Sequence, residues 1–490
     1  MANNPNLNIL TYQSKVVYVE QEYYTPTVII PATGRPISLP YAFFSKVDPW
    51  PLDATTNSEL PAQPTQDQKY LKSVYKNIFF VKQILSGDIS PVIERIDWTS
   101  GTQYSYYQDN IDMMELNVNG LLVNQFYVRN IYNQIFKCLW NASGAPSTVM
   151  PYFQPGNYGT NGIFVGADNY KWHYMFTIAT GDQVNFMDSS WIPVRITTGD
   201  SATTILNPLA SNPNTGIPAG SGDIEVINIT NGGSGYNTSN VITVTITGDG
   251  TAANGAPFTS ASAVVTASQI VAGAITDITI TDAGRNYTYA NVTITSDSGS
   301  GATAVVPVSP VGGHGFDPIS ELGCHHIMMT VELKGDENGN LPTNIDYAQV
   351  GILINPLAHS TYPYAANGVS YNTSTPITVA SGAGSYSNDE VVQQVDPVTG
   401  KLLFSGTVLN FSYSLSTLTN VVQLINTTGT PTLNLGLTGT SGCSRTVINV
   451  PNDTTPDFIR YSGYIAYIEN RASVQRSIDG IEQFKFVLGY

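Results

Sequence analysis

The sequence is poor in charged residues, in cysteine and in long apolar runs, and each scarcity removes a class of function. Lys and Arg number 20 against 36 Asp and Glu in 490 residues, which gives a formal net charge of −16. Binding to nucleic acid or to anionic lipid requires a dense basic face, which these few cations do not provide, so we expect neither partner. No stretch approaches the ~20 apolar residues that span a bilayer.

The cysteines and the first residues bear on the compartment. Cys138, Cys324 and Cys443 are far apart and odd in number. This pattern excludes a disulfide framework and favours a reducing environment during folding. Residues 1–6 contain neither a basic nor an apolar segment, so we expect no secretory signal.

Apolar residues, in contrast, are plentiful. The chain is 42% hydrophobic and 10% aromatic but only 11% charged, against about 25% charged in average soluble domains. A core is therefore available, and the surface must consist largely of Ser, Thr, Asn, Gln, Gly and Tyr. This composition is typical of secreted adhesins, β-repeat proteins and virion structural proteins.

Residues 1–199 predict a mixed α+β region. Alternation over residues 15–19 and 126–128 indicates strands. One amphipathic helix is expected from about residue 66 to 84, because apolar residues recur there at three- and four-residue spacing. These residues are Tyr70, Val74, Ile78 and Val81.

Residues 200–312 contain a pattern that occurs twice, which predicts an inserted β-repeat module. The first copy covers residues 227–236 and 244–248, and the second covers 278–287 and 292–296. Each copy reads as a β-branched strand, a Gly/Asn turn, a Tyr and a second alternating strand. Because two copies are too few for a free-standing solenoid, we expect them to pack against each other or against the host region.

Residues 365–450 predict a second inserted module, which is also all-β. Its alternating run, 415–425, is followed by a turn-rich segment at 426–429. Residues 313–364 and 451–490 are then returns of the interrupted host region.

Few residues suit metal binding. The one His/Cys cluster is His314, Cys324, His325 and His326. Since neighbouring strand residues point to opposite faces, we expect ordinary packing rather than a zinc site. Residues 336–340 resemble the start of an EF-hand loop, but Leu341 stands where that loop requires Gly, so a polar turn is expected.

Catalytic motifs are also scarce. The carboxylate pairs Asp389 with Glu390 and Glu94 with Asp97 are better interpreted as surface acids than as a glycosidase pair. No phosphate-binding loop, nucleophile elbow or zinc-protease motif occurs. We therefore predict that the protein is not an enzyme and has no catalytic, cofactor-binding or metal-binding residues and no cofactor.

Six segments resemble, in colinear order, the baseplate wedge proteins that are the gene-eight products of T-even-type contractile-tailed phages. Residues 92–98 (VIERIDW) are similar to the family's V-I-x-R-x-D-W, and residues 467–471 (YIENR) to its Y-x-E-N-R. Ala348 stands where the family has Arg before the Gln of its N-P-L segment. The six segments are 44–50, 92–98, 128–151, 169–178 with 191–194, 349–357 and 462–471.

The resemblance implies a structural virion protein of the tail baseplate that is assembled in the host cytoplasm. It implies a homodimer that contacts other baseplate wedge proteins and acts as a rigid spacer during baseplate rearrangement. We expect a mainly β (α+β) fold, a β-sandwich-type wedge scaffold with few helices that is interrupted by the two inserted all-β modules. The alternative is a β-repeat adhesin, or a carbohydrate-binding or depolymerising tail protein that acts at the host surface.

Overall fold

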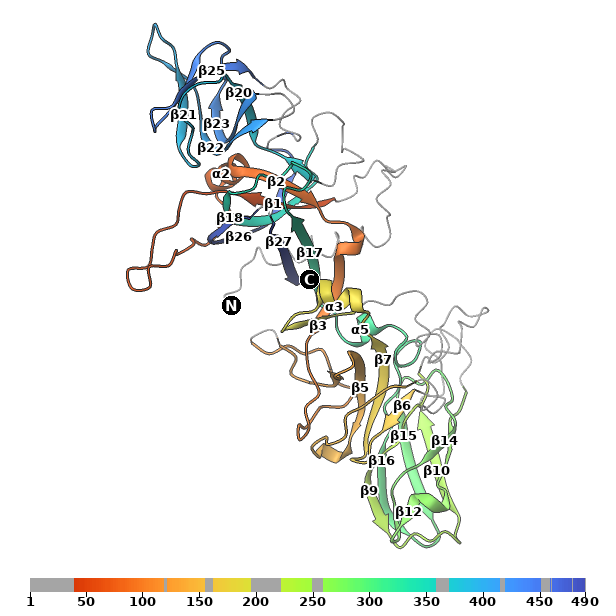
Figure 1. Ribbon diagram of the computed structural model, residues 1–490. Helices are drawn as coiled ribbons and strands as arrows, with labels where there is room; N and C mark the ends of the chain where they lie inside the picture. Colours follow the sequence, from red (N-terminus) through yellow and green to blue (C-terminus); the bar gives the residue numbers. More distant parts are fainter. Residues whose placement is uncertain are drawn as a thin grey trace, which may run out of the picture. The chain divides into compact units, whose positions relative to one another are not determined.

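The computed structural model describes residues 39–118, 121–154, 162–194, 222–248, 259–357, 370–414, 419–450, 459, 461–477 and 479–489. In these residues the chain is mainly β, as predicted, with three α-helices: α2 (Gln68–Asn77), α3 (Thr180–Phe186) and α5 (Pro318–Glu321) (Figure 1). None of the described helices has the length and apolar character of a membrane span. The strand expected at 15–19 lies outside the described residues.

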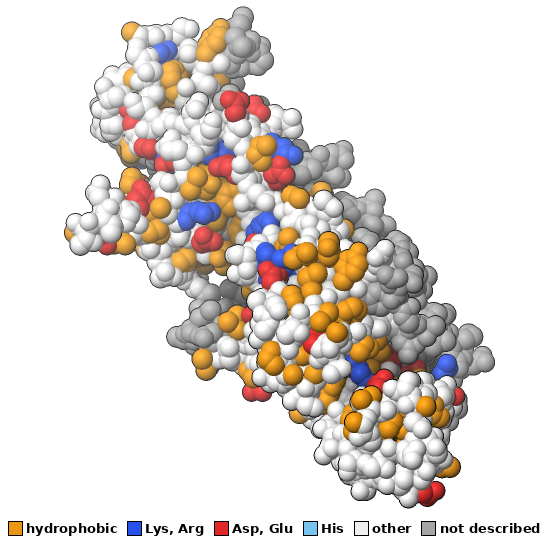
Figure 2. Space-filling view, turned by 60° about the horizontal axis from the view of Figure 1, so that its bottom comes forward, with side chains coloured by type: hydrophobic (Ala, Val, Ile, Leu, Met, Phe, Trp, Pro, Cys, Tyr) orange, Lys and Arg blue, Asp and Glu red, His pale blue; other side chains and the backbone are white. Residues whose placement is uncertain are grey.

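The chain forms two compact units. Unit 1 spans Ser90–His326, and unit 2 consists of Ala2–Ile89 and Ile327–Tyr490. The breaks fall inside the ranges 1–199 and 313–364 that the sequence assigned to the host region. The five-part division of the sequence stays a prediction. Charged side chains are scattered over the face drawn in Figure 2, most of which is uncharged.

Unit 2 is built on a five-stranded antiparallel sheet in the order β19-β2-β1-β18-β26. On β1, Tyr41 and Phe43 belong to one buried cluster with Val74 of α2, whereas Phe44 belongs to a second cluster with Phe484. Both faces of the sheet are therefore covered, as the alternation of strand side chains requires. The strands are β1 (Pro40–Ser45), β2 (Ile78–Gln83), β18 (Asp346–Ile354), β19 (Ser370–Asn372) and β26 (Tyr464–Gln475).

The second face of this sheet packs against β17 (His326–Lys334) and β27 (Ile481–Gly489), which are hydrogen-bonded neighbours. Met329 of β17 and Phe484 of β27 lie in the same buried cluster as Phe44. The rings of Phe44 and Phe484 are 4.9 Å apart. This sheet-on-sheet packing is sandwich-like.

The helix predicted over residues 66–84 is wrong in its second half. Helix α2 begins after Asp67, whose side chain accepts a hydrogen bond from Tyr70 N, and it ends at Asn77. The next residues, from Ile78, form β2 and pair with β1. Ile78 and Val81 lie in the same buried cluster as Val74. A helix followed directly by a buried strand thus gave the same apolar spacing as one continuous amphipathic helix.

The described part of the second inserted module contains a closed β-barrel in the order β20-β23-β22-β21-β24-β25. The turn predicted at 426–429 is wrong, because β23 continues to Gly429. A bulge at Asn426, with φ 49°, absorbs the irregularity. The strands are β20 (Thr375–Val379), β21 (Val391–Val395), β22 (Leu402–Ser414), β23 (Thr419–Gly429), β24 (Gly436–Gly439) and β25 (Ser444–Asn449).

Unit 1 contains a four-stranded sheet in the order β4-β5-β7-β6, and β3 pairs with β8. All eight residues of β5 are buried. One aromatic-rich core, which includes Phe136, Trp172 and Tyr174, holds these strands together. The strands are β3 (Ile89–Glu94), β4 (Tyr127–Arg129), β5 (Gln134–Asn141), β6 (Ile163–Val165), β7 (Tyr170–Thr177) and β8 (Trp191–Pro193).

The two copies of the sequence repeat pack against each other, which is one of the two arrangements that the sequence left open. Strand β10 of the first copy pairs antiparallel with β15 of the second, with Val244 opposite Ile294 and Ile246 opposite Val292. The first strand of each copy then pairs with the strand that follows the other copy. The strands are β9 (Asn228–Ser234), β10 (Ile242–Gly248), β11 (Ser262–Val264), β12 (Ile270–Val271), β13 (Ala274–Ile275), β14 (Thr279–Asp282), β15 (Ala290–Ser296) and β16 (Ser300–Val305).

The tyrosine of each repeat has the same role in both copies. The hydroxyl of Tyr236 accepts from Ala302 N at 3.2 Å, and that of Tyr287 accepts from Ala261 N at 2.7 Å. Gly233 and Gly284 precede these tyrosines at φ +63° and +64°, and a Cβ at either would collide with the paired backbone. The two copies therefore form a pseudo-twofold pair with exchanged strands.

Candidate functional site

The His/Cys cluster of the sequence does not gather at one point. His326 packs against Trp191, with ring centroids 4.4 Å apart. Cys324 lies in the hydrophobic core of unit 1, and His314 joins a different set of residues, described below. Across the described ranges, no group of three or more His, Cys, Asp or Glu is arranged to hold a metal ion.

The segment that resembles an EF-hand opening is a polar turn. Leu341 N donates to Asp336 O at 2.9 Å, and Glu337 and Asn338 adopt positive φ. The Glu337 carboxylate lies 2.9 Å from Lys82 Nζ. The charge of Glu337 is therefore paired with a lysine of unit 2.

Asp389 and Glu390 each have partners in unit 2. Asp389 lies 2.5 Å from Lys46 Nζ. Glu390 accepts from the backbone N–H of Ser387 and Ser441, each at 2.9 Å. Burial opposes ionisation of Glu390, but these donors prevail and lower its pKa.

Glu94 and Asp97 also have local partners, in unit 1. Glu94 accepts from Leu122 N at 3.1 Å. Asp97 lies between two guanidinium groups, 2.9 Å from Arg95 Nη2 and 2.6 Å from Arg129 Nε. Burial opposes its ionisation, but these two arginines together lower the pKa of Asp97.

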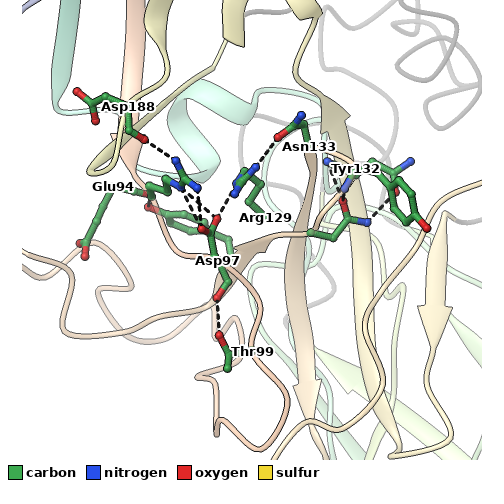
Figure 3. Close-up of polar contacts among 11 residues, drawn as sticks. Glu94, Asp97, Thr99, Arg129, Tyr132, Asn133 and Asp188 are labelled. Carbon is green, nitrogen blue, oxygen red and sulfur yellow. Dashed lines mark hydrogen bonds and ion pairs between the residues drawn. The ribbon is translucent and has the colours of Figure 1, made fainter. Parts of the chain in front are cut away.

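The Asp97 network joins three separate segments of unit 1 (Figure 3). Arg95 donates to the backbone carbonyl of Asp188 at 2.6 Å, and Arg129 donates to the side chain of Asn133. Next to Asn133, Tyr132 is largely exposed and lies 4.9 Å from the Tyr152 ring. The network therefore fixes the hairpin between β4 and β5.

The second polar cluster of unit 1 is buried and centres on Lys137. This residue is on β5, and its side chain is 0% exposed. Its Nζ lies 2.8 Å from Glu321 Oε2, 3.0 Å from His314 Nδ1 and 4.0 Å from the centre of the Tyr107 ring. A charge in such a place is tolerated only with close partners.

The same cluster is reached by the segments that lie just before the first described strand of the repeat module and just after its last one. Glu225 precedes β9 and His314 follows β16, and His314 N donates to Glu225 Oε1 at 3.2 Å. Asp223 and Ser309 also exchange two hydrogen bonds, of 2.9 and 3.1 Å. The buried cluster therefore fastens the base of the module to the host strands.

Burial and the Lys137 charge set the protonation of this cluster. Burial raises the pKa of Glu225 to about 8. His173, on β7, has its ring 5.7 Å from the His314 ring, and burial lowers its pKa to about 4. Burial and the charge of Lys137 lower the pKa of His314 to about 3. Burial lowers the pKa of Lys137. For Glu321, burial acts to raise the pKa, but the charge of Lys137 outweighs it and the pKa is lowered. Near neutral pH the ionised pair is thus Lys137 with Glu321.

Sequence reasoning missed this cluster. The available signal was one lysine inside the apolar run from Ile135 to Trp140. A lysine at such a position requires a buried partner. Its partner, Glu321, is 184 residues away, so the pair was not visible in local spacing.

The stability of unit 1 should fall as the pH rises from about 7 to 8. In this window the two histidines are neutral in the folded state and mostly neutral in the unfolded state, where their pKa is 6.5, whereas folded Glu225 keeps a proton that its unfolded form released near pH 4.5. A group whose pKa is raised by folding stabilises the folded state fully at pH values below its unfolded pKa. This stabilisation is lost as the pH rises through its folded pKa. The expected loss from Glu225 is about 1 kcal/mol over this window.

Urea unfolding at pH 7 and pH 8 measures this loss. Tryptophan fluorescence reports mainly on unit 1, which contains Trp98, Trp140, Trp172 and Trp191, with Trp50 alone in unit 2. The control Glu225→Gln carries the neutral form permanently and should remove the slope. An equal slope in both proteins would contradict the assignment.

Two comparisons with known proteins were made for this chain. A scan against models of protein families and a search of curated proteins returned no match for this chain.

Proposed function

We propose that this protein is a structural subunit of a contractile phage tail, a baseplate wedge protein that acts as a rigid spacer. The observation that carries the proposal is the pairing of β1, β18 and β26. These strands contain parts of three of the six segments that resemble the wedge family. Segments from distant parts of the sequence thus form one continuous framework.

One partly buried polar network supports the register of these three strands. Gln349, on β18, accepts from Ser45 Oγ at 3.0 Å and donates to Asn470 Oδ1 at 2.6 Å. Tyr70 OH accepts a hydrogen bond from Gln349 Nε2 and donates one to Asn470 Oδ1, each at 3.0 Å. Because buried amides are costly when unpaired, this network favours one register of the sheet.

The other family-like segments are framework strands of unit 1. Strand β3 includes the start of segment 92–98 and pairs with β8, with Val92 opposite Pro193. Strand β5 lies between β4 and β7, with Phe136 opposite both Val128 and Tyr174. The repeat module and the barrel form sheets of their own. Such an arrangement suits a scaffold that tolerates insertions in its loops.

A rigid spacer needs interfaces that hold while neighbouring subunits move. The buried Lys137 cluster and the Gln349 network suit that role, because each fixes strands through polar contacts that are wholly or partly buried. The homodimer and the contacts with other wedge proteins are part of the same proposal. We expect an interface rich in Tyr, Trp and Met with few charges.

Mass spectrometry of separated tail fractions from purified virions tests the assignment. We expect the chain in the baseplate fraction. Light scattering of the pure protein should give a dimer at micromolar concentration, at low and at high salt. A chain found outside the baseplate would favour the adhesin alternative, and a monomer would remove the proposed dimer.

A further inference from the structure

Unit 1 contains a pocket of about 330 Å³ beside the repeat module. One wall is the host loop 106–110, and the other walls come from residues 289–292 and 304–307 of the module. The volume lies at the lower end of the range for small-molecule sites. It suits one or two sugar-sized rings.

The walls of this pocket are held in place by direct contacts between module and host. Tyr107 OH donates to Val308 O at 3.3 Å, and Asn228 Nδ2 donates to Leu139 O at 2.9 Å. Lys171 Nζ donates to Ile227 O at 3.0 Å. The pocket is therefore largely formed before any ligand enters.

The lining combines two aromatic rings with amides. Tyr106 and Tyr289 supply the rings, and Gln108, Asn110 and Asn291 supply the amides. Within the described part of the chain, none of these three amide side chains has a hydrogen bond. Their donors and acceptors thus remain available to a ligand.

The charge of the lining narrows the ligand class. Asp109 is the one ionisable acid or base apart from tyrosine in the lining, which includes no Lys or Arg. An anionic ligand would lack a counter-charge, and one carboxylate is too few for a calcium ion. A purely apolar ligand would leave the amides unpaired. A neutral polyhydroxy compound satisfies both the amides and the rings.

The repeat gives an independent comparison. Between Tyr236 and Val244 the first copy has no aromatic residue, whereas the second copy has Tyr289 between Tyr287 and Val292. Tyr289 is 51% exposed, so the fold of the module does not require its ring in the core. The aromatic residue is thus present in the copy that lines the pocket.

We propose that the pocket between loop 106–110 and strands β15 and β16 binds a neutral saccharide. The rings of Tyr106 and Tyr289 pack against the sugar faces, and Gln108, Asn110 and Asn291 bond its hydroxyl groups. This inference does not depend on the wedge function, since a scaffold protein and an adhesin are equally able to carry such a site.

A glycan array with neutral and sialylated oligosaccharides, probed with the full chain, tests the proposal. We expect binding to neutral glycans alone. For the best of them, Tyr289→Ala should weaken binding about tenfold or more, and Asn291→Ala should weaken it as well.

The matched control is Tyr413→Ala, which removes a similarly exposed tyrosine from the barrel. It should leave binding unchanged. Thermal unfolding shows whether each variant is folded. The proposal is overturned if the wild-type chain binds no neutral glycan, if it prefers sialylated ones, or if Tyr289→Ala and Tyr413→Ala behave alike.

Discussion

Replacement of Glu321 by Gln is expected to lower the free energy of unfolding of unit 1 by about 3–5 kcal/mol, because it leaves Lys137 buried without a counter-charge. Lys137 Nζ is 0% exposed and its shortest contact is Glu321, at 2.8 Å. His314 is no substitute, since its pKa is lowered to about 3 and it stays neutral. Urea unfolding followed by tryptophan fluorescence measures the loss.

Two further variants separate charge from packing. The double variant Lys137→Met with Glu321→Leu removes both charges and should recover most of the stability, as apolar replacement of a buried ion pair often does. Asp277→Asn breaks the half-exposed pair with Lys171 in the same unit and should cost at most about 1 kcal/mol. Equal losses in Glu321→Gln and Asp277→Asn would show that burial of the Lys137 pair is unimportant.

Replacement of Gly351 by Ala is expected to disrupt the central sheet of unit 2. Gly351 lies on β18 between Phe43 of β1 and Ile468 of β26. A Cβ there would lie 2.1 Å from Tyr467 O and 2.5 Å from the Phe43 ring, neither of which is a flexible end. Overpacking at such a position should cost about 3 kcal/mol or more.

Hydrogen exchange measured by mass spectrometry locates the effect. Peptides from residues 346–354 and 464–475 should exchange faster in Gly351→Ala, while peptides from unit 1 keep the wild-type rate. Gly87→Ala is the control in unit 2, since a Cβ at Gly87 meets nothing within 4 Å. Unchanged exchange in Gly351→Ala would mean that β1, β18 and β26 are not packed in this way.

The sequence predicted the dominance of β-structure, which follows from local alternation. For the two repeats it left open packing against each other or against the host region, and the structure shows the two copies paired. The prediction was wrong at two places where it set the end of a helix or a strand. The helix predicted to residue 84 ended at Asn77, since the apolar run that begins at Ile78 is buried in a sheet. The turn predicted at 426–429 became a bulge inside β23, because pairing with β22 outweighed local turn propensity.

The polar sites were less visible. Lys137 is one charge in an apolar strand, which is a signal that the sequence analysis missed, and no local rule names Glu321, His314 and Glu225 as its neighbours. The pocket at loop 106–110 joins residues up to 201 positions apart, from Tyr106 to Pro307. Such sites depend on which loops the fold brings together, and a single sequence carries no record of that.

The scarcity of charge, cysteine and long apolar runs was set by the sequence alone, and with it the mainly β character of the chain. Only the tertiary structure decided where the few charges go. It enclosed Lys137 with Glu321 and set the Asp97 carboxylate between two arginines. The physical reason is that alternation and propensity act over a few residues, whereas burial and charge pairing depend on segments that meet only in the folded chain.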